Sequence, residues 1–118
     1  TITASQVANN KTSEDSSLSM TFTSSETTSD FSIEDVTVAN GVMSDFSAVS
    51  SSVYTAILTP ATEGVVTIDV AAGTFTDSVS NNNYAATQFK WTYLSSPIAK
   101  KDVVGLVEVT VSIATNRV

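Results

Sequence analysis

The 118-residue chain contains no cysteine and no histidine. The missing thiol excludes disulfide bonds and cysteine nucleophiles. The missing imidazole excludes Ser-His and Cys-His dyads, and the two absences together remove the ligands of ordinary zinc sites. Enzymes that depend on these dyads or on an ordinary zinc site are therefore excluded by composition.

Basic residues are also scarce, since five Lys and Arg stand against twelve Asp and Glu, for a net charge of −7. Phosphate binding needs clustered basic side chains, so we expect no nucleic-acid partner. No apolar run reaches the roughly 20 residues of a membrane span. The chain opens without a basic-then-apolar leader, so we expect either that a signal was removed or that the chain is part of a longer one. This acidic composition favours an extracellular, cell-surface location.

Hydroxyl and β-branched residues are abundant instead. The chain has 19 Ser, 18 Thr, 16 Val and 6 Ile, with only 4 Gly and 2 Pro. This composition is typical of strands. It favours an all-β structural or binding module over an enzyme.

Apolar and polar residues alternate with a period of two along most of the chain, as in Leu18, Met20 and Phe22. Short strands at intervals of about ten residues, with turn signals between them, indicate a β-sandwich. Residues 9–16 read as a polar loop, and Asn40-Gly41 as a tight hairpin turn before the strand 42–46. We predict seven strands: 1–3, 18–23, 31–38, 42–46, 53–59, 66–70 and 89–93.

The same alternation predicts the core. Most aromatic residues lie at strand positions that face inward, whereas Tyr84 lies in a polar loop and is the aromatic we expect to be most exposed. The residues expected between the two sheets are Phe22, Val36, Tyr54, Ile68 and Trp91, with Phe31, Phe46 and Tyr93 also assigned to the core.

The end of the chain departs from this pattern. We divide the chain into a sandwich at 1–94 and an extension at 95–118. After the break at Pro97 the extension holds a further alternating strand, whose apolar positions are Val107, Val109, Val111 and Ile113. An unpaired strand of this kind is a template for pairing. It would become an eighth strand of its own sandwich, the start of a following domain, or a strand donated to a neighbouring subunit. We expect these four residues to bind a partner, either another copy or a neighbouring domain of the same assembly.

The segment 18–91 resembles a bacterial Ig-like domain of the kind repeated in tandem in large surface adhesins and in proteins of marine bacteria and their viruses. The matching pieces are, in order, 17–26, Phe31, 34–41, Phe46, 53–60, 64–73, 75–77 and Asn81. The resemblance implies an Ig-like Greek-key sandwich and a non-enzymatic role as a spacer, adhesion or display module. The chain departs from the family at 78–81, where Ser80 replaces a glycine that would supply a positive φ.

Few residues suggest chemistry. Glu14-Asp15 and Glu34-Asp35 are paired acids, but nothing around them in the sequence suggests an apolar cleft. Asp77, Asn81, Asn82 and Asn83 offer oxygen ligands for Ca²⁺, yet with one carboxylate where calcium sites use several. We therefore expect no catalytic residue and no obligatory cofactor or metal. The leading hypothesis is a structural or adhesive surface module. A virion component, such as a capsid decoration or tail-fibre module, and a carbohydrate-binding module that uses Tyr84 are the alternatives.

Overall fold

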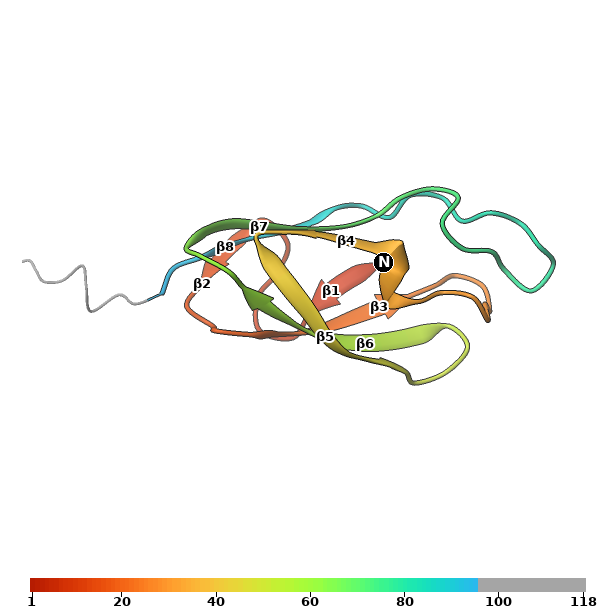
Figure 1. The fold of residues 1–118 in the computed structure, drawn as a ribbon, viewed down its shortest axis with the longest axis horizontal. Coiled ribbons are helices and arrows are strands. Elements are labelled where there is room, and N and C mark those ends of the chain that lie inside the picture. The colour runs from red at the N-terminus through yellow and green to blue at the C-terminus, as the bar shows by residue number, and fades with distance from the viewer. Residues whose placement is uncertain (96–118) are drawn as a thin grey trace, which may run out of the picture.

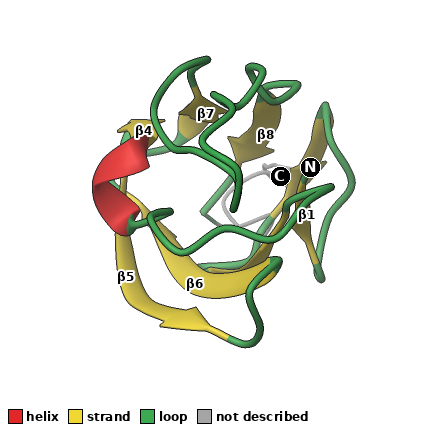
Figure 2. Cartoon of the chain, turned by 90° about the vertical axis from the view of Figure 1, so that its right-hand side faces the viewer, coloured by secondary structure: helices red, strands yellow, loops and turns green. Residues whose placement is uncertain are grey.

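A computed structural model describes residues 1–95 as two four-stranded β-sheets packed face to face (Figures 1 and 2). Residues 96–118 lie outside the described part, and with them the predicted extension strand and its four apolar residues. Within residues 1–95 no helix is long and apolar enough to cross a membrane. The elements are β1 Ile2–Ala4, β2 Lys11–Ser13, β3 Leu18–Thr23, the 3₁₀ turn η1 Ile33–Asp35, β4 Val36–Ala39, β5 Gly41–Ala48, β6 Val53–Pro60, β7 Gly64–Val70 and β8 Phe89–Tyr93.

The strand orders are β1-β3-β6-β5 in one sheet, called sheet A here, and β2-β8-β7-β4 in the other, called sheet B. The N-terminal segment therefore contributes to both sheets. β1 pairs antiparallel with β3, and after a short connection β2 pairs parallel with β8. All other pairings are antiparallel. This is the arrangement of an Ig-like sandwich, so the predicted fold class is confirmed.

The prediction of a loop over residues 9–16 was wrong, because β2 lies inside it. Its three residues, Lys11, Thr12 and Ser13, include no apolar side chain and therefore show no alternation. The strand forms because it can pair with β8 at the sheet edge, not because it buries a face. Six of the seven predicted strands are present, whereas the strand predicted over 31–38 begins only at Val36, because residues 33–35 form η1. With β2, the described residues contain eight strands.

The predicted hairpin at Asn40-Gly41 was also wrong. β4 and β5 belong to different sheets, so the dipeptide turns the chain from sheet B into sheet A. Asn40 has a φ of +61°, as a turn requires, but Gly41 does not have a positive φ. Close packing favours glycine there, since a Cβ atom would lie 3.1 Å from Leu58 Cδ1 and 3.1 Å from the Thr59 carbonyl oxygen.

The core follows the period-two pattern. Leu18, Met20 and Phe22 of β3 point inward, and their neighbours point outward or are half-buried. Four of the five residues predicted to fill the core are buried, and Val36 is half-buried because β4 is an edge strand. Phe31, Phe46 and Tyr93 pack partly buried against the core. The buried apolar residues are Ile2, Leu18, Met20, Phe22, Tyr54, Ala56, Leu58, Val66, Ile68, Val70, Phe89 and Trp91.

The connection between β7 and β8, residues 71–88, forms an arm that projects beyond the end of the sheets (Figure 1). At its tip the Ser80 N–H donates to the Asp77 carbonyl at 3.1 Å, and the Asp77 N–H donates to the Asn81 carbonyl at 2.9 Å. Ser80 has a φ of +69°. The turn that glycine serves in the family is therefore kept, with serine held in the left-handed region.

We expect Ser80→Gly to raise the free energy of unfolding by about 0.5–1 kcal/mol. A left-handed conformation costs an L-residue about 1–2 kcal/mol, and glycine avoids this cost. The greater conformational freedom of glycine in the unfolded chain offsets part of the resulting stabilisation. Urea denaturation measures the change. The control is Ser78→Gly, the same substitution at a position without positive φ, which we expect to destabilise. Equal losses in both variants would contradict the assignment of strain to Ser80.

Candidate functional site

The two acid pairs do not form a catalytic centre. Glu14 and Asp15 lie between β2 and β3, whereas Asp35 lies in η1, where its Oδ2 accepts the Ser32 N–H at 2.8 Å. Asp35 thus caps the 3₁₀ turn. Across residues 1–95 no three His, Cys, Asp or Glu side chains gather in a way that could hold a metal ion.

The arm's oxygen-rich tip uses its single carboxylate for its own structure. Asp77 Oδ1 accepts the N–H groups of Val79 and Asn81, each at 2.9 Å. Asp77 Oδ2 accepts the side-chain amide of Asn81 at 3.1 Å. These bonds, led by the one from the Asn81 backbone, hold the pKa of Asp77 below its ordinary value of 3.8. The carboxylate therefore serves the turn, and the expectation that this loop needs no calcium stays a prediction.

Asn83 fixes the base of the arm. Its Oδ1 accepts the N–H groups of Thr74 and Phe75, at 2.8 and 3.0 Å. Its Nδ2 donates to the carbonyls of Ala71 and Tyr84, at 2.9 and 3.0 Å. One amide thus satisfies four backbone groups that no strand pairs. The sequence shows Asn83 only as one of three adjacent asparagines, so this role could not be predicted.

Asp30 ties the arm to the sandwich. Its carboxylate accepts the Thr76 N–H, at 3.0 Å to Oδ1, and the Thr76 hydroxyl, at 2.7 Å to Oδ2. Thr28, which is only 4% exposed, donates its hydroxyl to the Thr76 carbonyl at 2.6 Å. The Tyr54 hydroxyl donates to the Thr28 carbonyl at 3.2 Å and so links this network to the core.

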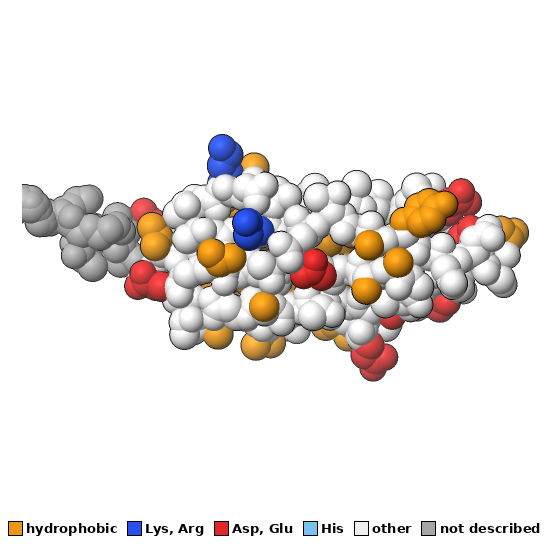
Figure 3. Space-filling view, turned by 90° about the horizontal axis from the view of Figure 1, so that it is seen from above, with side chains coloured by type: hydrophobic (Ala, Val, Ile, Leu, Met, Phe, Trp, Pro, Cys, Tyr) orange, Lys and Arg blue, Asp and Glu red, His pale blue; other side chains and the backbone are white. Residues whose placement is uncertain are grey.

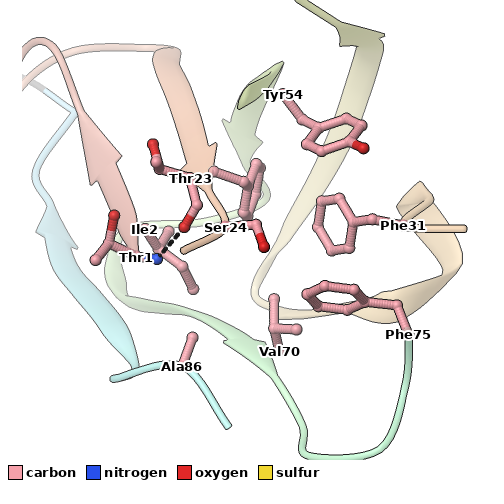
Figure 4. Close-up of a pocket in the computed structure, with 10 residues that line it drawn as sticks. Thr1, Ile2, Thr23, Ser24, Phe31, Tyr54, Val70, Phe75 and Ala86 are labelled. Carbon is pink, nitrogen blue, oxygen red and sulfur yellow. Dashed lines mark hydrogen bonds between the residues drawn. The ribbon is translucent and has the colours of Figure 1, made fainter. Parts of the chain in front are cut away.

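A small apolar cavity lies behind this network, where Phe31, Tyr54, Phe75, Val70 and Ala86 point toward one another (Figure 4). The ring of Phe31 is 4.9 Å from those of Tyr54 and Phe75, centroid to centroid, in edge-to-face geometry. The cavity measures about 40 Å³. Small-molecule sites usually occupy about 300–1,000 Å³, so this space is a packing gap and not a ligand pocket.

A larger polar groove of about 510 Å³ runs between the arm and the loop after β3. Tyr84 lines it and is 93% exposed, which confirms the expectation for this residue. Four polar side chains of the groove are engaged in hydrogen bonds, namely those of Ser24, Asp77, Asn81 and Asn83. Within residues 1–95 the other polar side chains of the groove make no side-chain hydrogen bond, among them those of Glu26, Asn82 and Tyr84.

The first and last parts of the described chain are joined by a second polar cluster, which we call the terminal clamp and define as residues 9–13 with 88–94. Its centre is the parallel pairing of β2 with β8. Backbone bonds extend this pairing at both ends. The Asn10 N–H donates to the Lys90 carbonyl at 2.7 Å, and the Leu94 N–H donates to the Ser13 carbonyl at 3.0 Å.

Side chains complete the terminal clamp. The side chain of Asn9 bonds to the backbone beside β8 as a paired strand would. Its Oδ1 accepts the Lys90 N–H at 2.7 Å, and its Nδ2 donates to the Gln88 carbonyl at 3.0 Å. The indole N–H of Trp91 donates to Ser13 Oγ at 3.0 Å. Figure 3 looks onto sheet B, and the two lysine side chains that it shows lie over this sheet. They are Lys11 and Lys90, the basic residues of the described part, and both belong to the terminal clamp.

The anchor at Asp30 predicts a dependence on pH. Hydrogen bonds from Thr76, its backbone first, lower the pKa of Asp30 below its ordinary value of 3.8. A lowered folded-state pKa stabilises the fold fully above the unfolded value near 4, and this contribution is lost as pH falls through the folded value. We therefore expect Asp30→Asn to destabilise the protein at pH 7 and to differ less from wild type at pH 2.5.

Urea unfolding at the two pH values measures this difference. The control is Asp45→Asn, because the Asp45 carboxylate makes no hydrogen bond within the described residues. We expect the control to show little effect at either pH. An Asp30→Asn penalty that is as large at pH 2.5 as at pH 7 would contradict the anchor.

The family model of the bacterial Ig-like domain matches residues 1–93, which contain all eight strands and end with β8. No curated protein and no solved structure matches the chain significantly. The match covers well over half of the chain, and the two sheets have the topology that an Ig-like domain requires. The chain therefore belongs to the bacterial Ig-like domain family.

Proposed function

We propose that the chain is a structural module that carries tension between its two ends within an extracellular surface assembly. Bacterial Ig-like domains are generally non-catalytic and typically belong to surface proteins. This background fits the described residues, whose acidic pairs lie apart and whose polar networks hold loops in place. The terminal clamp is the observation that carries the more specific proposal.

The direction of the strands matters for tension. β2 and β8 are parallel, and both run along the long axis of the sandwich toward the end at which β8 stops (Figure 1). A force that pulls residue 1 and residue 95 apart loads the pairing of β1 with β3 first, and once β1 detaches it draws β2 backward and β8 forward. The two strands must then slide along each other. All bonds of the terminal clamp are loaded together in this geometry, whereas peeling would break them one at a time.

The other candidate functions receive less support from the described surface. A carbohydrate-binding role would use Tyr84 and the groove beside it, whose polar side chains on the arm at Asp77, Asn81 and Asn83 are already bonded within the arm, which leaves Asn82 and the loop after β3 as the other polar contacts. A virion component that attaches a particle to a surface would carry the same load as a cell-surface spacer. The tension-bearing role is therefore common to both surface settings.

Single-molecule force spectroscopy of the full chain, held through its two ends, tests the proposal. Asn9→Ala removes two clamp bonds, and we expect it to lower the unfolding force. Each such bond contributes about 1 kcal/mol, and forced unfolding follows the height of the unfolding barrier.

The control is Asn83→Ala, which removes the same side chain and its hydrogen bonds from the arm, outside the load path. We expect Asn83→Ala to lower the free energy of unfolding in urea while the unfolding force stays close to that of wild type. An Asn9→Ala force equal to wild type, or an equal loss of force in the two variants, would overturn the proposal.

A further inference from the structure

The edges of the two sheets differ in how well they are closed. β1 and β2 are edge strands of three residues each, and side-chain amides cover the strands beside them. Gln6 Oε1 accepts the Ser19 N–H at 2.9 Å next to β1, and Asn9 binds Lys90 next to β2. This side of the sandwich therefore offers little backbone for pairing with another chain.

β5 is the other edge of sheet A, and it is irregular. Its pairing with β6 shifts register between Ser44 and Ser47. Asp45, inside the shift, has a φ of +54° and an exposed side chain. A bulge and a charge on an edge strand are features that hinder edge-to-edge pairing.

β4, the remaining edge, has neither protection. The Val70 carbonyl accepts the Ala86 N–H, so the backbone groups of Val70 point to the β8 side and not to β4. Alternation along an antiparallel pair then makes Val38, opposite Ile68, a residue whose N–H and C=O point away from β7. Within residues 1–95 no group bonds to them. β4 itself carries no charged side chain.

Beside this edge lies an apolar seam, which we define as Val36, Val38, Met43 and Phe46. β4 is an edge strand of sheet B and β5 is an edge strand of sheet A, and both lie on the same side of the sandwich (Figure 2). The four side chains pack against the core but remain partly exposed. An added strand on β4 would cover them with its alternate side chains.

The chain itself contains a segment that fits. Residues 96–118 supply 23 residues beyond the sandwich, with apolar side chains at 107, 109, 111 and 113. Charge favours the same match. Residues 1–95 carry ten acidic and two basic side chains, whereas residues 96–118 carry two acidic and three basic ones. Glu34 and Asp35 precede β4. Lys100, Lys101 and Arg117 lie on either side of the apolar segment, and the two acidic residues of 96–118 are Asp102 and Glu108.

We propose that residues 107–113 of one copy add as a strand to the β4 edge of a second copy, with Val107, Val109, Val111 and Ile113 covering the seam. A second copy is the favoured acceptor because β8, which leads into the segment, is separated from β4 of its own sheet by β7. β8 also points out of the end of the sandwich (Figure 1). This contact is separate from the proposed tension-bearing role, since it joins one copy to the side of another.

The first test measures the mass of the full chain in solution over a range of concentrations. We expect wild type to associate as concentration rises and Val109→Asp to remain at the monomer mass of 12.3 kDa. Thr110→Asp is the matched control, because a period of two places Thr110 on the opposite face. We expect it to associate like wild type. A wild-type chain that stays monomeric, as pairing with its own β4 would leave it, would overturn the proposal, as would equal disruption by Thr110→Asp.

The second test addresses the acceptor edge. Val38→Pro removes the outward N–H, and proline is tolerated at edge positions whose N–H faces solvent. We expect this variant to keep the wild-type melting temperature within a few degrees and to be monomeric. Mixed with Val109→Asp, it should form a one-to-one complex of twice the monomer mass, because one variant keeps the strand and the other keeps the edge. A mixture of two folded variants that stays monomeric would overturn the proposal.

Discussion

The burial of Trp91 is the constraint on which the rest of the sandwich depends. The indole is 0% exposed in the centre of the core, yet its N–H needs a partner. Ser13 of β2 provides that partner at 3.0 Å. A buried donor left without a bond costs about 1–3 kcal/mol. The largest core side chain can therefore be buried fully only while the N-terminal segment stays on β8.

This coupling explains why β1 and β2 are needed although they are short. β1 closes sheet A against β3, and β2 closes sheet B against β8. Asn9 and Gln6 extend the two strands with side-chain amides where the backbone does not continue the pairing. The N-terminal segment thus seals one side of the sandwich. The opposite side, at β4 and β5, keeps an open backbone edge and a partly exposed apolar seam, which makes it the side suited to contacts between copies.

Prediction from the sequence succeeded where burial imposes a period and failed where polar groups decide. β3, β6, β7 and β8 bury alternate side chains, so their positions and the burial of Trp91 followed from the pattern. β2 buries no face. Asn40-Gly41 has the composition of a hairpin, although close packing against Leu58 and Thr59 is what favours the glycine. Ser80 is a second case in which residue type misleads, since surrounding hydrogen bonds hold a serine in the left-handed conformation that glycine usually adopts.

The candidate sites were harder to predict for the same reason. The exposure of Tyr84 followed from its polar neighbours. The anchor of Asp30 on Thr76 joins residues 46 positions apart, and the bonds of Asn9 to Gln88 and Lys90 join residues 79 and 81 positions apart. No local pattern marks such contacts, because a side-chain amide or carboxylate that caps a distant backbone looks in sequence like any loop residue.

Native-state hydrogen exchange shows whether β2 leaves β8 only when the core unfolds, because it measures how often the terminal clamp opens without unfolding of the core. We predict that the indole N–H of Trp91 and the backbone N–H of Lys90 exchange only through global unfolding. Their free energy of opening should then equal that of the amides of β6. Exchange of these two groups at a free energy far below the global value, while β6 stays protected, would show that β2 leaves β8 independently and would contradict the account.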